Sequence, residues 1–410
     1  MENLTDAGRD GDAGDLTGQK LWTRDFLTIT IENFLVAVNF LMLFAVVAKF
    51  ATDRFDASST LAGLSAGIFV IGALITRPLY GKWIHRIGQT KMLYGGVVLS
   101  LAFSLAYFAV NSVGLLLPIR FLHGAAFAAA HVATGTIVTG VVPKERYGEG
   151  IGYFALSQIL ANALGPFIGL LLIQHGSFDS VIIASAVASG AALIILPFIS
   201  VRDVKLTEGQ LEEARGLRLK SFIEPKAVPI SLVTMVLYLC YASIVSFLGL
   251  YAEEIRLVGA ASVFFIVYAT VVFLERPFVG RRFDAKGENS VVYPAILVFA
   301  IGLAVFSQAR HSFVLLLSAA IIGVAFGVLQ SSGQTIAVMT APPHRRGLAT
   351  STFFLFADVG VGVGPLLVGF LISFVGYRET FVVLAIVVVG CLFLYYALHG
   401  RHVTRKAAST

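Results

Sequence analysis

Charged side chains are scarce in this chain of 410 residues, in which Asp, Glu, Lys and Arg together make up 13% of the sequence. Soluble domains carry about 25% of such residues, and the mean hydropathy here is +0.85, so a water-soluble globule is excluded. Cysteine is nearly absent: Cys240 and Cys391 both lie within apolar runs, which leaves no disulfide framework and no thiolate metal site. The sequence requires lipid as its solvent.

Several signatures of processing and catalysis are also missing from the sequence. The first twenty residues are polar and have no apolar core, so they do not form a signal peptide. Neither a Gly-x-x-x-x-Gly-Lys-Ser/Thr loop nor a His-Glu-x-x-His motif is present, which argues against an ATPase and a zinc hydrolase. We expect no enzymatic activity, no cofactor and no metal site. The net charge of +6 follows from membrane topology, so we expect no nucleic-acid partner.

The chain instead contains twelve apolar runs of about 20 residues, the length that a transmembrane helix needs. The runs are too long for strands and lack the alternating pattern of membrane barrels, so only helices satisfy their backbone groups in lipid. The sequence therefore predicts an all-α membrane protein with twelve transmembrane helices. The predicted spans are residues 26–48, 61–80, 92–110, 114–139, 149–172, 180–199, 227–251, 260–280, 291–308, 312–339, 347–372 and 379–398.

The distribution of Lys and Arg predicts the orientation of these helices. If the N-terminus is cytoplasmic, most of the 30 Lys and Arg residues fall in cytoplasmic segments, as the positive-inside rule requires. We therefore predict a multi-pass protein of the cell membrane (a bacterial inner or plasma membrane) with both termini cytoplasmic. In the longest connection, Thr207 and Gln210 fit a capping box for a short helix. The predicted organisation is a disordered tail at 1–24, a six-helix bundle at 25–199, a linker at 200–226, a six-helix bundle at 227–398 and a tail at 399–410.

The two predicted bundles repeat one another. A shift of 199 positions superimposes Arg77-Pro78 on Arg276-Pro277 and Gly165-Pro166 on Gly364-Pro365, and it also aligns Phe127 with Phe326. Because Arg-Pro and Gly-Pro pairs are uncommon, matches at a single shift indicate an internal duplication. Two parallel, pseudo-symmetric six-helix halves are an architecture of secondary transporters, with the substrate site near the midplane between them.

Three motifs give the chain a resemblance to the major facilitator superfamily of transporters along nearly its whole hydrophobic length. The segment from Gly81 to Lys91 resembles that family's loop motif, with Arg86 and Gly88 in place and His85 where an Asp is expected. The stretch "RFLHGAAFAA", which begins at Arg120, resembles the motif whose intramembrane Arg is linked to proton transfer.

The third motif lies in the fifth predicted helix and resembles one that is associated with antiporters. Gly152, Gly165, Pro166 and Gly169 fit this motif, whereas Ala161 and Leu170 replace glycines. The resemblance points to the twelve-helix drug/proton antiporters within the superfamily. Small residues four apart allow close helix approach, and Pro166 interrupts the helix hydrogen bonds. We expect a bending, tightly packed seam between the two halves here, with ordinary small-residue packing as the alternative.

The loop motif occurs once in each half, and the resemblance implies that it helps to close the cytoplasmic side. Its Asp would face a helix N-terminus in the other half, where the helix dipole favours a negative charge. The second copy, with Gly280, Asp284 and Gly287, fits this arrangement. His85 cannot act as the anion in the first copy, so we predict that the first-half latch is the weaker one.

Ionisable side chains inside the predicted helices are candidates for proton coupling, because a charge at a helix centre costs roughly 2.5–3.5 kcal/mol on insertion scales. Glu32 lies inside the first helix, with Asn39 seven residues further along nearly the same face. Asp358 lies near the middle of the eleventh helix and is free to pair with Arg120, bind a cationic substrate or carry a proton. A purely structural role remains the alternative for each carboxyl group.

Two histidines extend the stripe of Arg120 along the fourth helix. His123 and His131 follow at spacings that keep them on one face, and histidine titrates in the physiological range. His131 lies at a depth similar to that of Glu32, which makes a pair between them possible. Packing as ordinary hydrogen-bond donors is the alternative for both histidines.

Other polar and aromatic side chains are candidates for the substrate cavity, which the resemblance places between helices 1, 4, 7 and 10. The candidates are Asn39, Phe127, Gln158, Asn162, Tyr238, Tyr241, Gln330 and Gln334.

Taken with the resemblance, these features predict a proton-coupled secondary transporter that exports drugs or related amphipathic molecules by alternating access. The expected partners are the substrate, protons and the lipid bilayer, and the expected functional unit is a monomer. A narrow-substrate metabolite exporter or a proton-coupled importer is the first alternative. A non-transporting receptor or scaffold is the second alternative, and the insertion cost of the intramembrane charges counts against it.

Overall fold

The computed structural model describes residues 21–143, 147–200, 223–342 and 346–401, and this part of the chain is almost entirely helical. The helices of the N-terminal half are α1 (Arg24–Phe55), α2 (Ser59–Ile87), α3 (Gln89–Ala106), α4 (Val113–Val141), α5 (Tyr147–His175) and α6 (Phe178–Ile195). Those of the C-terminal half are α8 (Val228–Glu254), α9 (Val258–Lys286), α10 (Asn289–Ser307), α11 (Ser312–Thr340), α12 (Arg346–Val375) and α13 (Tyr377–Tyr395). All twelve of these described helices are long and apolar enough to cross a membrane, which confirms the predicted fold class.

The helix ends follow from local chemistry. The Thr23 hydroxyl accepts from the Phe26 amide at 3.2 Å and caps α1. Between α2 and α3 the turn consists of Gly88 alone, at φ 92°, and between α9 and α10 it consists of Gly287, at φ 73°, and Glu288. Glycine adopts such angles without strain, which permits these short turns. Since α2 ends at Ile87 and α9 at Lys286, most of each loop motif is helical and not part of a loop.

The internal duplication extends to helix boundaries and packing. Helices α2 and α9 both contain 29 residues, and α4 and α11 both contain 29. A Cβ added to Gly124 would lie 1.8 Å from the Phe69 carbonyl oxygen, and one added to Gly323 would lie 2.8 Å from that of Tyr268. The same pair of glycine and helix backbone therefore joins α4 to α2 and α11 to α9.

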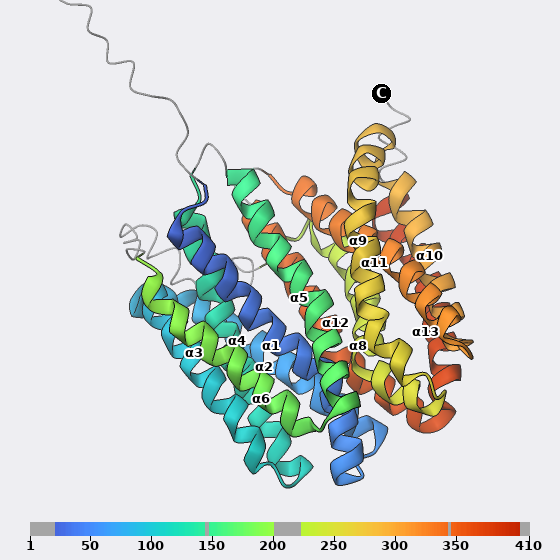
Figure 1. Cartoon of the computed structure of the whole chain (residues 1–410). Helices are drawn as coiled ribbons and strands as arrows, with labels where there is room; N and C mark the ends of the chain where they lie inside the picture. The colour runs from blue at the N-terminus through green and yellow to red at the C-terminus, as the bar shows by residue number, and fades with distance from the viewer. Residues whose placement is uncertain (1–20, 144–146, 201–222, 343–345, 402–410) are drawn as a thin grey trace, which may run out of the picture.

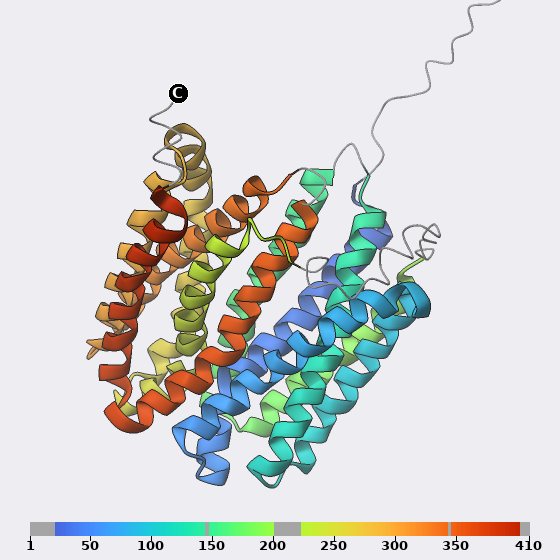
Figure 2. The same cartoon turned by 180° about the vertical axis from the view of Figure 1, so that it is seen from behind.

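The two halves lie side by side and meet mainly along three pairs of helices (Figures 1 and 2). Helix α2 packs on α12, α5 on α9 and α1 on α8. The start of α1 and the end of the chain's last helix lie at one end of the molecule, here called the terminal end; the opposite end is called the loop end. Helices α5 and α9 diverge toward the terminal end in Figure 1.

The outer surface of the bundle is apolar. Phe313 and Phe393 are each 75% exposed, and Ile194 is 72% exposed. Large exposed apolar side chains on spanning helices are suited to contact with lipid.

Three predicted segments fall wholly or largely outside the described residues. These are the disordered N-terminal tail, the short helix at Thr207 to Gln210, and the C-terminal tail beyond residue 401.

Candidate functional site

An ion pair joins the two halves in the interior of the bundle. Arg77 of α2 donates from Nη1 to Oδ2 of Asp358 on α12. The two side chains are 26% and 24% exposed, so neither is completely enclosed by protein. Asp358 lies twelve residues into its helix, or about 18 Å from the terminal end at 1.5 Å per residue. The pair therefore lies in the interior of the span, where a charge needs a partner.

Two candidate residues from the fourth and seventh spans lie near this pair. His131 of α4 lies within electrostatic range of Arg77, and Tyr238 of α8 within range of Asp358. The ring of His131 lies 5.4 Å from that of Phe127, and the ring of Tyr238 lies 5.0 Å from that of Phe326. The arrangement places charged, titratable and aromatic groups from both halves around one point.

Arg120 does not take part in this site, and its suggested pairing with Asp358 is wrong. The fully buried guanidinium donates to the carbonyls of Ser65 and Ala66 at 3.0 and 3.2 Å. It also donates to the Tyr107 hydroxyl at 3.4 Å and lies 4.7 Å above the Phe69 ring. Across the described ranges no carboxylate pairs with it. Arg120 thus holds α4 against α2 and the end of α3 by carbonyl and cation–π contacts.

His123 shares a partner with Arg120. Its Nδ1 lies 3.3 Å from the Tyr107 hydroxyl, and its ring is 1% exposed. The ring also packs edge-on against Phe69 at 5.2 Å. His123 therefore belongs to the core of the N-terminal half and not to the contact between the halves.

Glu32 is the buried acid of the described part of the chain whose two carboxyl oxygens both lack a hydrogen-bond partner. Its side chain is 0% exposed, and neither carboxyl oxygen has a hydrogen-bond partner there. The possible pair with His131 is therefore not formed. A buried carboxylate without partners is strongly disfavoured, so the carboxyl group is suited to holding a proton.

Asn39 anchors a cluster of buried hydroxyl groups inside the N-terminal half. Its amide donates to Ser189 at 2.7 Å, while Ser185 donates to its carbonyl oxygen at 2.6 Å. Ser104 lies 2.8 Å from Ser185. Asn39 was expected in the substrate cavity, and the structure satisfies it within its own bundle.

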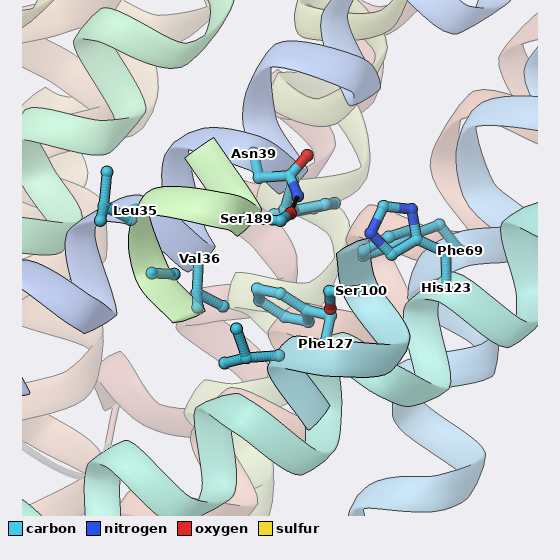
Figure 3. A pocket seen from close by; sticks show the side chains of 11 residues that line it. Leu35, Val36, Asn39, Phe69, Ser100, His123, Phe127 and Ser189 are labelled. Atoms are coloured by element: carbon cyan, nitrogen blue, oxygen red, sulfur yellow. Dashed lines mark hydrogen bonds between the residues drawn. The ribbon is translucent and has the colours of Figure 1, made fainter. Parts of the chain in front are cut away.

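The cluster borders a small cavity of about 10 Å³ (Figure 3). Ser100, His123 and Phe127 line it together with Asn39 and Ser189. Figure 3 shows His123 and Phe69 at one side of the cavity and Leu35 and Val36 at the opposite side. Helices α1, α2, α3, α4 and α6 all contribute to its wall.

The remaining cavity candidates are distributed over both halves. Tyr241 stacks on Phe326 at 4.0 Å, and Gln158 donates to Asn162 at 3.3 Å within α5. Gln330 and Gln334 are half-buried on α11. Within the described residues, none of these five side chains lines the small cavity of the N-terminal half or the larger cavity at the loop end.

The glycines of the antiporter-like motif pack within their own half. A Cβ on Gly165 would meet Leu41 of α1 at 2.7 Å, and one on Gly169 would meet the Met42 carbonyl oxygen at 2.7 Å. Gly364 packs in the same way on Leu239 of α8. The expected role of this glycine face as the seam between the halves is therefore wrong, and the alternative of small-residue packing holds.

The cytoplasmic latch that the two copies of the loop motif predict depends on two side chains that the structure does not describe. The side chains of His85 and Asp284 are outside the described structure, while Arg86 and Lys91 are exposed.

A short string on α2, Gly63 to Gly67, spells Gly-x-Ser-x-Gly but is no hydrolase motif. Its Ser65 hydroxyl bonds the Leu61 carbonyl in mid-helix, whereas a nucleophilic Ser requires a sharp turn between strand and helix.

At the loop end, a second set of charges joins the halves. Lys49 Nζ lies 2.5 Å from both Asp53 Oδ2 and Glu253 Oε1, and thus links α1 to α8. These residues line a cavity of about 450 Å³, together with Tyr107 and other side chains of α5, α6 and α9. The described contacts between the halves extend from this end as far as the Arg77–Asp358 pair.

Sequence reasoning missed Arg77, Lys49, Glu253, Tyr107 and the serine cluster. Only Arg77 carried a signal, since it is an intramembrane arginine in the duplicated Arg-Pro pair. The other residues owe their importance to neighbours on different helices, which helical periodicity does not reveal.

Comparison with known proteins extends over nearly the whole chain. The family model of the Major Facilitator Superfamily matches residues 30–309 and 258–410. An uncharacterized MFS-type transporter of Methanocaldococcus jannaschii is 23% identical over 381 residues, covering 91% of this chain and 96% of that protein.

Solved structures share the fold at low sequence identity. The nucleoside transporter NupG superimposes with a TM-score of 0.72 at 14% identity, covering 92% of this chain and 100% of that one. A bacterial homolog of the human lysosomal transporter Spinster, in an inward-facing and occupied conformation, gives 0.74 at 13% identity, covering 93% and 97%. At such identities the likeness establishes the fold alone.

Proposed function

The chain belongs to the major facilitator superfamily, and on that premise we propose that it is a proton-coupled exporter of amphipathic small molecules. It works by alternating access, in which the two halves rock about a site between them. The observation that carries the proposal is the Arg77–Asp358 ion pair, which joins the halves in the interior of the bundle and is not completely enclosed by protein. A scaffold would gain nothing from two intramembrane charges that need each other.

The Arg77–Asp358 pair is a contact between the halves that a substrate or a proton can break. A cationic substrate competes with Arg77 for Asp358, and a proton on Asp358 removes the attraction altogether. Either event weakens one link between the halves. The substrate or proton can therefore shift the equilibrium between two conformations, which a ligand that binds both equally well cannot do. Tyr238 and His131 border the pair and supply aromatic surface for an amphipathic molecule.

Glu32 supports proton coupling. It is buried, it has no partner in the described structure, and it therefore changes its charge only by taking up or releasing a proton. Export by exchange with protons also agrees with the resemblance of the fifth helix to the antiporter motif. Uptake together with protons, or export of one metabolite, remains the second candidate, favoured by the nucleoside specificity named for NupG.

The positive-inside distribution supports an orientation with the terminal end in the cytoplasm. With that orientation, the Lys49–Glu253 contact closes the outer end, and the conformation faces the cytoplasm. The protein then functions as a monomer in the cell membrane.

The test is proton movement in vesicles that contain the purified protein and a pH-sensitive dye, with a panel of amphipathic cations added. We expect at least one compound to drive proton movement across wild-type vesicles, and we expect Asp358→Asn and Glu32→Gln to abolish it. Asp53→Asn, at the exposed loop end, is the matched control and should retain it. Full coupling in both interior variants would contradict the assigned sites, and no proton movement with any compound would contradict the exporter.

A further inference from the structure

The duplication allows the buried positions of the N-terminal half to be compared with the equivalent positions of the C-terminal half. The polar cluster of the N-terminal half has apolar counterparts in the C-terminal half, 199 positions further on. Ser100, Ser104, Tyr107, His123, Ser185 and Ser189 correspond to Phe299, Leu303, Phe306, Ile322, Leu384 and Val388. These six counterparts are at most 3% exposed, so they form an ordinary dry core. The fold does not require polar groups at these positions.

The polar groups of the N-terminal half form a connected set. Tyr107 lines the loop-end cavity and contacts His123 at 3.3 Å. His123 lines the small cavity, across from Asn39 and Ser189 (Figure 3). A cavity of about 10 Å³ with several polar groups in its wall has the size and the partners that one water molecule needs.

The far side of this cavity approaches Glu32. Leu35 and Val36 line it, and these residues follow Glu32 by three and four positions, which makes them its neighbours on the helix surface. The one buried acid of the described N-terminal half whose carboxyl oxygens have no hydrogen-bond partner therefore lies one helical turn from the cavity.

We propose that the small cavity binds one water molecule and that this water completes a proton path from the loop-end cavity through Tyr107 and His123 to Glu32. A proton enters on the Tyr107 oxygen as the hydroxyl proton passes to His123 Nδ1. The other ring nitrogen releases a proton to the water, which passes one on to the Glu32 carboxylate. Tyr107 is again a neutral hydroxyl and the water is again neutral, whereas His123 is left as its other neutral tautomer, with the proton on Nδ1, and must exchange tautomers before the next transfer. In each passage one proton leaves the loop-end cavity and one arrives at Glu32.

The surrounding charges set where the proton rests. Arg120 donates to the same Tyr107 hydroxyl, and its positive charge opposes a proton that stays on His123. Glu32 has no cation within hydrogen-bond distance in the described structure. The proton therefore passes His123 and rests on Glu32. The proton path itself does not depend on the proposed function; the use of this proton to drive transport does.

The test is hydrogen–deuterium exchange of the Glu32 carboxyl group, followed by its infrared C=O band after transfer of the substrate-free protein to D₂O. Glu32→Gln identifies the band. His123→Ile and Ser189→Val place the residue of the other half at each position, so we expect them to fold. Each should slow exchange by about tenfold or more, the factor that corresponds to 1.36 kcal/mol in a barrier.

Ser318→Val is the matched control, because its buried hydroxyl bonds only its own helix in the C-terminal half; it should leave the rate unchanged. Ser189→Ala removes the hydroxyl without adding volume and serves if the larger variants do not fold. Equal exchange rates in wild type and the His123 and Ser189 variants would overturn the proposal, as would a Glu32 carboxyl that is already ionised at neutral pH. Since no substrate is present, either result leaves the transport proposal standing.

Discussion

The two long seams between the halves are related by the duplication but are built differently. On the α2/α12 seam the backbones touch: a Cβ on Gly67 would lie 1.9 Å from the Gly362 carbonyl oxygen, and one on Gly63 would lie 1.9 Å from that of Pro365. On the α5/α9 seam, side chains separate the helices, and Ser262 donates to Gln174 at 2.5 Å near the loop end.

The sequence positions explain this difference. Gly63 and Gly67 correspond to Ser262 and Ile266, and Asp358 corresponds to Ile159. The α5/α9 seam therefore lacks the two glycines that bring the α2 and α12 backbones together and the acid that pairs with an arginine. We infer that the α2/α12 seam is the pivot of the rocking motion and that the α5/α9 seam is the side that changes.

The largest effect is expected from enlarging the pivot. Gly67→Ala places a methyl group against a backbone carbonyl that cannot rotate away, and such overpacking costs about 1–3 kcal/mol or more. We expect a lower midpoint of thermal unfolding in detergent and loss of transport. Gly95→Ala, with nothing within 4 Å of the added Cβ, is the matched control and should stabilise its helix by about 0.5–1 kcal/mol. Equal thermal stability of the Gly67→Ala and Gly95→Ala variants would contradict the inference that the α2/α12 seam is the pivot.

Breaking the charge pair on the same seam should have the next largest effect. Asp358→Asn leaves Arg77 without its counter-charge at a partly buried site, at a cost of about 1–3 kcal/mol. A double-mutant cycle with Arg77→Gln should return part of that loss, because contacting residues are not additive. Additive changes in unfolding free energy would mean that the pair contributes nothing to the seam.

The smallest effect is expected on the other seam. Ser262→Ala removes one hydrogen bond, which contributes about 1 kcal/mol, and no backbone contact depends on it. Transport rates should stay near those of wild type while the Gly67 and Asp358 variants fail. A loss of transport as large as theirs would show that the two seams are equivalent.

Much of the architecture is predictable from the sequence, because lipid imposes it. Run lengths set the twelve helices, and the repeated Gly124 and Gly323 foretell the same packing in both halves. The partners of the charges are not predictable in this way. A pair between Arg120 and Asp358 is one of three roles that the sequence leaves open for Asp358, yet the guanidinium of Arg120 donates to carbonyls of α2 instead. Helical periodicity orders residues along one helix but does not specify which face meets which neighbour.

The most direct measurement is the distance between the halves at both ends of the same molecule. Spin labels at Ser112 and His311 report on the loop end, and labels at Thr139 and Met339 report on the terminal end; all four residues are exposed. When a transported compound is added, or when Asp358→Asn is introduced, rocking about the α2/α12 seam predicts that the loop-end distance lengthens and the terminal-end distance shortens. If both distances change in the same direction, or if neither changes, alternating access about this pivot is contradicted.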